Sequence, residues 1–248
     1  VGGGIVFIPV FDYLFRAKGI YGEELVRYIL ANSFLCIFFS GIVSSYRQFR
    51  LKNFYPKLIL YTAIPAMLFA WLVSSLIAGH DWYKEIYFKF FFVLLLLYTL
   101  IRSNIRKNRK SEVVVSDDNR PWVNGLIGAA AGTVSAFSGL GGGVAMIPLM
   151  TGITRFDIRK AASVSIGVIP LLALPHLWVY MRSVPSESFD YQIGYIHYGM
   201  ALPLIAGVLL SSGFGVRLAH RVEQKYLKLI FAILILILII KYTLEISS

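Results

Sequence analysis

The sequence predicts an all-α, polytopic membrane protein made of two inverted-topology repeats of about five apolar segments each. The first observation is composition: 57% of the 248 residues are hydrophobic and only 15% are charged. A water-soluble globule needs more polar surface than that. The second observation is a glycine motif that occurs twice, and the third is the gathering of basic residues in four connections.

The glycine motif marks the two copies of the repeat. One Gly-Gly-Gly run begins at Gly2 and leads to Pro9, and another begins at Gly141 and leads to Pro148, so corresponding positions are 139 residues apart. Chance clusters inside apolar segments would not share their spacing to a proline. We therefore divide the chain into a first repeat (1–102), a basic linker (103–120) and a second repeat (121–248).

The two repeats differ in what precedes their glycines. The apolar segment Trp122–Leu140 precedes the second run, whereas almost nothing precedes the first. We therefore expect that the first segment of repeat 1, about twenty residues if it spans a bilayer, is missing from this chain.

The apolar segments are of two lengths. Long ones approach or exceed the roughly eighteen residues that mark a membrane helix, and they are Leu58–Ala78, Ile86–Ile101, Ile193–Val216 and Leu227–Ile240. The segments that begin at the glycine runs, Gly2–Phe15 and Gly141–Ile153, are short. A helix of that length covers about 20 Å of a hydrocarbon core about 30 Å thick. We therefore expect short broken or re-entrant helices at both runs.

The net charge of +11 comes from the connections. Seventeen of the 24 basic residues lie in four clusters, namely Arg47–Lys57, Arg102–Arg120, Arg155–Lys160 and Arg217–Lys228. Clusters between apolar segments mark cytoplasmic connections rather than a nucleic-acid surface. An odd number of segments in each repeat puts all four clusters on one side and gives the repeats opposite orientations. We therefore expect a cell-membrane protein with cytoplasmic basic loops and no nucleic-acid partner.

Glycines at the start of a helix permit two roles. Backbone N–H groups there have no intrahelical partner, the helix dipole is positive, and an anion can approach closely where side chains are absent. Glycine is also the favoured residue where membrane helices pack closely. Both interpretations stay open on the residues alone.

Other reactive side chains are few. Cys36 has no second cysteine with which to pair, and His176 and His197 are interpreted as interfacial histidines with satisfied hydrogen bonds. The chain has no phosphate loop with lysine, no zinc spacing and no convergent catalytic set. We therefore expect no enzyme activity, no cofactor and no metal site.

The motif and its surroundings resemble a known family. Residues 138–143 (Ser-Gly-Leu-Gly-Gly-Gly), then Pro148, then Ala161-Ala162-Ser163, are similar to the signature of the TauE/SafE sulfite exporter family. The first-half copy, with Ala31-Asn32-Ser33, is similar to its partner, and the resemblance covers essentially the whole chain. It implies transport of small sulfur-containing anions, such as sulfite, a sulfonate or sulfoacetate, across the cytoplasmic membrane.

The sequence-based hypothesis is one anion site near the midplane, exposed alternately by two inverted repeats. The glycines supply backbone donors and nearby polar side chains complete the site, so the expected substrate-binding residues are Gly2, Gly3, Gly4, Asn32, Ser33, Ser138, Gly141, Gly142, Gly143, Ser163 and Ser165. The alternative is a non-transporting membrane assembly or scaffold protein whose glycines serve helix packing. From the sequence, Gly142→Ala distinguishes them, because it would abolish flux without lowering the folded yield only if the glycines form a site.

Overall fold

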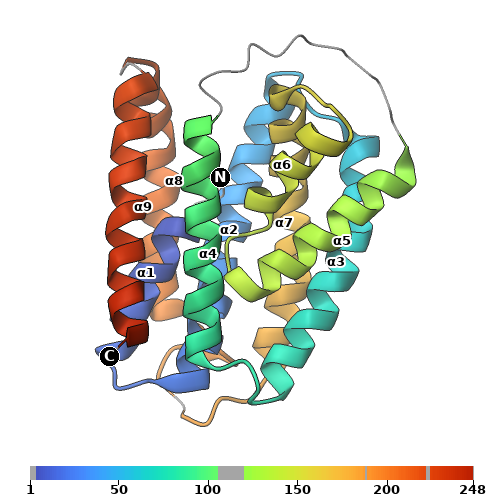
Figure 1. The fold of residues 1–248 in the computed structure, drawn as a ribbon. Helices are drawn as coiled ribbons and strands as arrows, with labels where there is room; N and C mark the ends of the chain where they lie inside the picture. The colour runs from blue at the N-terminus through green and yellow to red at the C-terminus, as the bar shows by residue number, and fades with distance from the viewer. Residues whose placement is uncertain (1–3, 106–119, 188, 222–223, 248) are drawn as a thin grey trace.

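The apolar segments form helices that lie side by side in one bundle in the computed structural model, which describes residues 4–105, 120–187, 189–221 and 224–247 (Figure 1). The helices in these ranges are α1 (Gly4–Arg16), α2 (Gly22–Arg50), α3 (Pro56–Gly79), α4 (Glu85–Ile105), α5 (Pro121–Ser138), α6 (Gly143–Ile153), α7 (Ile158–Arg182), α8 (Tyr198–Arg221) and α9 (Gln224–Ser247). The all-α prediction is confirmed.

The helices that begin at the glycine motifs are short, as predicted. α1 has 13 residues and α6 has 11. α5 enters the bundle from the end where α4 finishes, the chain turns inside the bundle, and α6 returns to the same end (Figure 1). α5 and α6 are therefore a re-entrant pair.

Glycines make that turn possible. Gly139 ends α5 with φ 67° and donates its N–H to the carbonyl of Ser135, and Gly142 begins α6 with φ 71°. Left-handed backbone of this kind is strained for residues with a Cβ atom. Prolines at the first turns of α3 and α5, Pro56 and Pro121, fix the starts of those helices, where a missing N–H costs nothing.

Two further glycines bring α5 directly against α3. A Cβ atom at Gly128 would collide with the carbonyl oxygen of Thr62, and one at Gly132 with that of Ala66. The spacing Gly128-x-x-x-Gly132 is the small-residue pattern of close membrane-helix packing. The α3–α5 pair therefore joins the two halves of the chain.

One segment differs from the expected helix. Ile193–Val216 was expected to be a single apolar segment, but two strands, Gln192–Ile193 and Ile196–His197, form an antiparallel hairpin before α8 begins. Gly194 turns the chain with φ 56°, and Tyr195 donates its N–H to the carbonyl of Tyr180. The hairpin lies at the end of the bundle where α4 begins (Figure 1).

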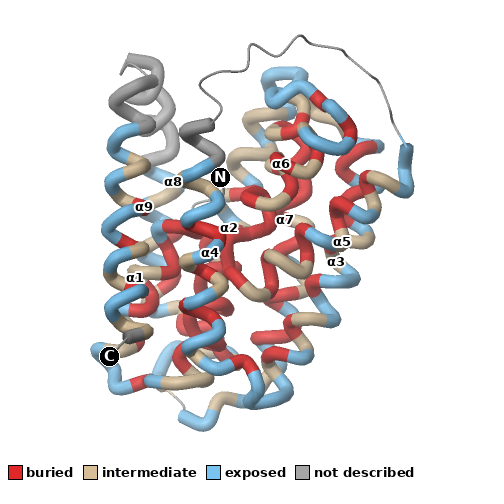
Figure 2. Tube along the Cα trace, in the orientation of Figure 1, coloured by how far each residue is buried: buried red, intermediate tan, exposed pale blue. Residues whose placement is uncertain are grey.

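The outer surface of the bundle is apolar. Four helical stretches in the described residues are long and apolar enough to cross a membrane, and they are Gly22–Arg50, Pro56–Gly79, Ile158–Arg182 and Leu229–Ile246. Leu60, Ile64 and Leu68 on α3 are exposed, as are Ile233 and Ile237 on α9, and Figure 2 shows such exposed positions along the outer helices. An apolar surface this extensive faces lipid. The protein is a multi-pass membrane protein.

Two of the four basic clusters fall on described loops. The α2–α3 and α6–α7 connections, which hold Arg47–Lys57 and Arg155–Lys160, lie at the same end of the bundle (Figure 1). Residues 106–119 and the side chains of 211–228 lie outside the described part, and with them most of the other two clusters.

The α3–α5 contact predicts a sharp difference between two glycines. Gly128→Ala places a methyl group on the Thr62 carbonyl, and overpacking of this kind costs about 1–3 kcal/mol. Gly207→Ala on α8, where nothing lies within 4 Å of the new atom, is the matched control. Thermal unfolding in detergent should show a lower midpoint for Gly128→Ala only, and equal midpoints would contradict the packing described.

Candidate functional site

The glycine loop between α5 and α6 is buried and tightly surrounded. A Cβ atom at Gly141 would lie 2.9 Å from Cγ2 of Ile37, and one at Gly142 would lie 2.8 Å from Cδ2 of Leu172. Both glycines have positive φ, 74° and 71°. Apolar side chains of α2 and α7 therefore fill the space that the glycines leave.

The first motif reaches the same place. A Cβ atom at Gly4 would lie 2.9 Å from the carbonyl oxygen of Gly139 and 2.9 Å from Cα of Leu140. The start of α1 thus touches the loop that precedes α6. Gly2 and Gly3 lie outside the described residues.

The start of α6 has fewer free donors than the sequence suggested. Gly143 donates its N–H to the carbonyl of Gly141, and Ala145 and Met146 donate to that of Gly142. The loop therefore satisfies three of the four N–H groups in the first turn, and Val144 is the exception among the described hydrogen bonds.

A cavity of about 170 Å³ lies beside this turn. Among the predicted residues Ser165 lines it, and a Cβ atom at Gly143 would lie 3.2 Å from the Ser165 hydroxyl oxygen. The other lining residues come from α2, α6 and α7 and are Ser40, Gly41, Ser44, Ile147, Ala162, Ile166 and Ile169. The walls carry three hydroxyls and no charged side chain.

Sequence reasoning missed the two serines of α2, although a signal was present. Ser33, Ile37, Ser40 and Ser44 are spaced by four, three and four residues, which puts them on one face of a helix. Ile37 lies against Gly141, so it separates Ser33 from the cavity along that face. The Ser33 hydroxyl is fully buried and has no hydrogen-bond partner among the described residues.

Three predicted site residues have structural partners instead. The Asn32 amide donates to the carbonyls of Tyr28 and Tyr195, and its oxygen accepts the N–H of His197 at 2.9 Å. Ser138 donates to the carbonyl of Val134 and accepts the N–H of Leu140. Ser163 donates to the carbonyl of Asn53. Asn32 therefore holds the hairpin, Ser138 the glycine loop and Ser163 the α2–α3 connection.

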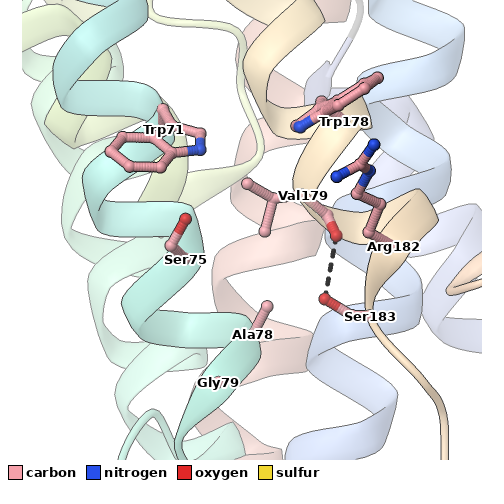
Figure 3. Close-up of a pocket in the computed structure, with 8 residues that line it drawn as sticks. All are labelled: Trp71, Ser75, Ala78, Gly79, Trp178, Val179, Arg182 and Ser183. Carbon is pink, nitrogen blue, oxygen red and sulfur yellow. Dashed lines mark hydrogen bonds between the residues drawn. The ribbon is translucent and has the colours of Figure 1, made fainter.

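A second cavity, of about 260 Å³, lies between the C-terminal ends of α3 and α7 (Figure 3). Its lining includes Trp71, Ser75 and Arg182, and the Arg182 guanidinium carbon lies 3.9 Å from the centre of the Trp178 ring. Figure 3 shows the two tryptophans flanking the groove. Tryptophan and arginine are typical of the membrane–water boundary.

His176 has satisfied hydrogen bonds, as interpreted from the sequence, and its ring is covered by other helices. It is fully buried, with Nδ1 2.6 Å from the Ser74 hydroxyl and Nε2 3.2 Å from the Ser135 hydroxyl. Its ring is stacked on Phe34 at 3.8 Å. The position in the sequence, late in its span, did not reveal that α3 and α5 would cover it.

A network of six charges joins α1, α4 and α9. Asp12 pairs with Arg16 and Lys241, and Glu85 pairs with Arg16 and Lys89. Glu245 pairs with the same three cations, including Lys89 at 2.8 Å. The network balances three carboxylates against three cations.

Comparison with known proteins identifies the family. Residues 1–242 match the family model described as sulfite exporter TauE/SafE. The chain belongs to the TauE/SafE sulfite exporter family. TauE/SafE proteins are membrane transporters and not enzymes.

Three relatives of this TauE/SafE chain carry the name probable membrane transporter protein. One from Methanocaldococcus jannaschii is 25% identical over 94% of this chain and 84% of its own. One from Haemophilus influenzae is 25% identical over 99% and 91% of the two chains, and YunE from Bacillus subtilis is 21% identical over 96% and 88%. No solved structure matches the chain.

The sequence suggested that Gly142→Ala would distinguish a binding site from a packing role. The structure indicates that it does not. The new Cβ would lie 3.0 Å from the carbonyl oxygen of Ala131, at a backbone φ of 71°. We therefore expect loss of folded yield whatever the role of the loop. Yield equal to that of wild type after purification would contradict this.

Asn32→Ala should loosen the hairpin. The substitution leaves the His197 N–H and the Tyr195 carbonyl without this partner, and a buried polar group left unpaired costs about 1–3 kcal/mol. Hydrogen exchange at residues 195–197 should be faster, whereas Thr99→Val on α4, whose hydroxyl only bonds its own helix, should leave it unchanged.

The same hairpin should respond to pH. Burial, and then the Lys18 ammonium, lower the pKa of His197 below its ordinary value of 6.5. The opened hairpin therefore binds a proton more readily, so its closure is most stable above about pH 6.5 and weakens as pH falls toward the lowered pKa. Exchange at the His197 N–H, corrected for intrinsic rates, should increase between pH 7.5 and 5.5. His197→Gln should abolish that dependence, and its persistence would exclude His197 as the cause.

Proposed function

We propose that this TauE/SafE protein transports small sulfur-containing anions of the sulfite, sulfonate or sulfoacetate class across the cytoplasmic membrane, with its basic loops in the cytoplasm. The family's description names sulfite. The observation that carries the proposal is the serine-lined cavity beside the start of α6. Three hydroxyls without a formal charge suit an anion that has to be released again.

The size of the cavity supports a small substrate. At about 30 Å³ of liquid per water molecule, the 170 Å³ holds a small oxyanion with part of its hydration shell. Ser165 comes from α7, Ile147 comes from α6, and Ser40 and Ser44 come from α2. The lining thus draws on both halves of the chain.

Alternating access between the inverted repeats is the mechanism we propose. The opposite directions of α1 and α6 in Figure 1 support it, since each begins inside the bundle and the two leave at opposite ends. In the described conformation Ile37 and Leu172 cover Gly141 and Gly142. Movement of α2 against α7 would uncover the loop and bring the predicted backbone donors into contact with the anion.

The alternative, a non-transporting assembly or scaffold role, also has an observation in its favour. The glycine loop packs against apolar side chains with no space between them. Transport requires this packing to open, whereas a scaffold requires it to stay closed. Flux of any sulfur oxyanion through the purified protein decides between the two.

Ser165→Ala should reduce flux without lowering the folded yield. A hydrogen bond to an anion contributes about 1.5–3 kcal/mol, so the loss corresponds to roughly a 10- to 150-fold weaker interaction. The measurement is uptake of radiolabelled sulfite and sulfoacetate into proteoliposomes, with Thr99→Val as the control because it removes a hydroxyl far from the cavity in sequence and helix. Equal flux in both variants would remove the cavity from the pathway, and no flux in the wild type would refute transport of this class.

A further inference from the structure

Resting on the transport function proposed above, we propose that His176 binds a proton together with the transported anion and so links anion movement to proton movement. The argument depends on where the imidazole lies, on which groups surround it, and on what its two nitrogens contact.

His176 lies where the two halves of the chain meet. Ser74 on α3 and Phe34 on α2 come from the first half, whereas Ser135 on α5 and His176 itself on α7 come from the second. Any movement of one half against the other therefore changes the surroundings of the imidazole.

The imidazole is connected to the glycine loop. The Ser135 carbonyl accepts the N–H of Gly139, while the hydroxyl of the same residue lies 3.2 Å from Nε2 of His176. Leu172, one turn before His176 on α7, covers Gly142. A rearrangement that opens the loop would therefore change the surroundings of the imidazole through Ser135 and Leu172.

His176 also lies between the two cavities along α7. Ser165 lines the cavity beside α6, and Arg182 lines the cavity of Figure 3. At 1.5 Å per residue, Ser165 lies about 16 Å from His176 along the helix axis and Arg182 about 9 Å, and other residues that line the cavities, Ile169 and Val179, lie closer. The imidazole therefore lies between the two cavities.

No carboxylate contacts the ring among the described residues. Its neighbours from the other helices are Ser74, Ser135 and Phe34. The titratable group beside it on its own helix is Tyr180, whose ring is also stacked with that of Phe34, at 6.3 Å between centroids. A buried imidazolium without a counter-charge is costly. Entry of an anion provides a counter-charge, so proton and anion favour each other's binding.

The charged groups nearest to Tyr180 contact it only through Tyr195. Its ring packs edge-on to Tyr195, whose hydroxyl contacts Arg27 and Glu24, and Arg27 is paired with Asp81. The acids in this direction are therefore already engaged with a cation. Asp12, a buried acid on α1, is paired with Arg16 and Lys241.

The hydroxyls give the protonated ring a means of holding the anion. A neutral imidazole has one N–H, so it donates to one serine and accepts from the other. When a proton from water binds the nitrogen that had accepted a serine hydrogen bond, both ring N–H groups donate to the serines. Both serine hydroxyl hydrogens are then available to oxyanion oxygens. The Tyr180 hydroxyl, buried without a hydrogen-bond partner among the described residues, is a third donor nearby.

Proton uptake on anion binding tests the proposal directly. Sulfoacetate, which stays ionised in the range used, is added to purified protein in weakly buffered detergent solution at pH 6.5, and pH and bound anion are recorded together. We expect about one proton taken up per anion by the wild type and none by His176→Gln, whose amide retains hydrogen bonding to the serines. His80→Gln, at an exposed histidine, should behave like the wild type.

The outcomes separate the two proposals. Anion binding without proton uptake in the wild type, or uptake retained in His176→Gln, overturns the linkage and leaves transport standing. Absence of both binding and flux for every sulfur anion tried overturns the proposed function and the linkage with it.

A second measurement covers the case in which His176→Gln does not fold. Wild-type affinity for sulfoacetate should fall about tenfold per pH unit once pH exceeds the pKa of the anion-free protein, and it should level off above the higher pKa of the anion-bound protein. Ser135→Ala, which removes one acceptor of the imidazolium, should shift the onset of that fall to lower pH. An affinity independent of pH between 5.5 and 8.5 in the wild type overturns the linkage.

Discussion

A bilayer core offers no water to a broken backbone, and the rest of this structure depends on how the chain meets that constraint at residues 139–142. The turn from α5 to α6 lies inside the bundle, so its own carbonyls accept the N–H groups of Gly143, Ala145 and Met146. Gly139, Gly141 and Gly142 adopt the left-handed conformations that aim those carbonyls, at less cost than residues with a Cβ atom. Because these three residues lack side chains, apolar side chains of α1, α2 and α7 can pack directly on the backbone of the loop. The short lengths of α1 and α6 follow from the same break.

The candidate site is neutral, whereas a site for an anion is commonly expected to be basic. The cationic side chains of the described loops lie at the ends of the bundle, whereas the cavity beside α6 presents serine hydroxyls. A lysine at that depth would bind an anion tightly and would itself be costly to bury. Hydroxyls provide direction without a permanent charge. If His176 supplies the charge, it does so only while a proton is present, which combines attraction on entry with release on exit.

The sequence predicted the positions of the helices better than the contacts between their residues. Hydropathy and the repeated glycine motif located α1, α3 and α6 closely, because length and composition decide whether a segment crosses a bilayer. The role of Asn32 was not predictable, since its partners Tyr195 and His197 belong to a hairpin more than 160 residues away. The complete burial of His176 was not predictable, because periodicity indicates a face but not which helix covers it. Ser40 and Ser44 were within reach, given their spacing from Ser33, but only the position of α6 reveals what they face.

The charge network described for α1, α4 and α9 has a mechanical consequence. Its ion pairs fasten the first half of the chain to α9 along one edge of the bundle, and the glycine contacts of α5 fasten α3 to the second half along the other. Figure 1 shows these two pairs on opposite sides of α2 and α7. Because these contacts hold both edges of the bundle, the two halves cannot simply separate. The alternating-access movement proposed above would be a rotation about the two edges. Its largest displacement would then fall on the contact between α2 and α7, where Ile37, Ser165 and His176 lie.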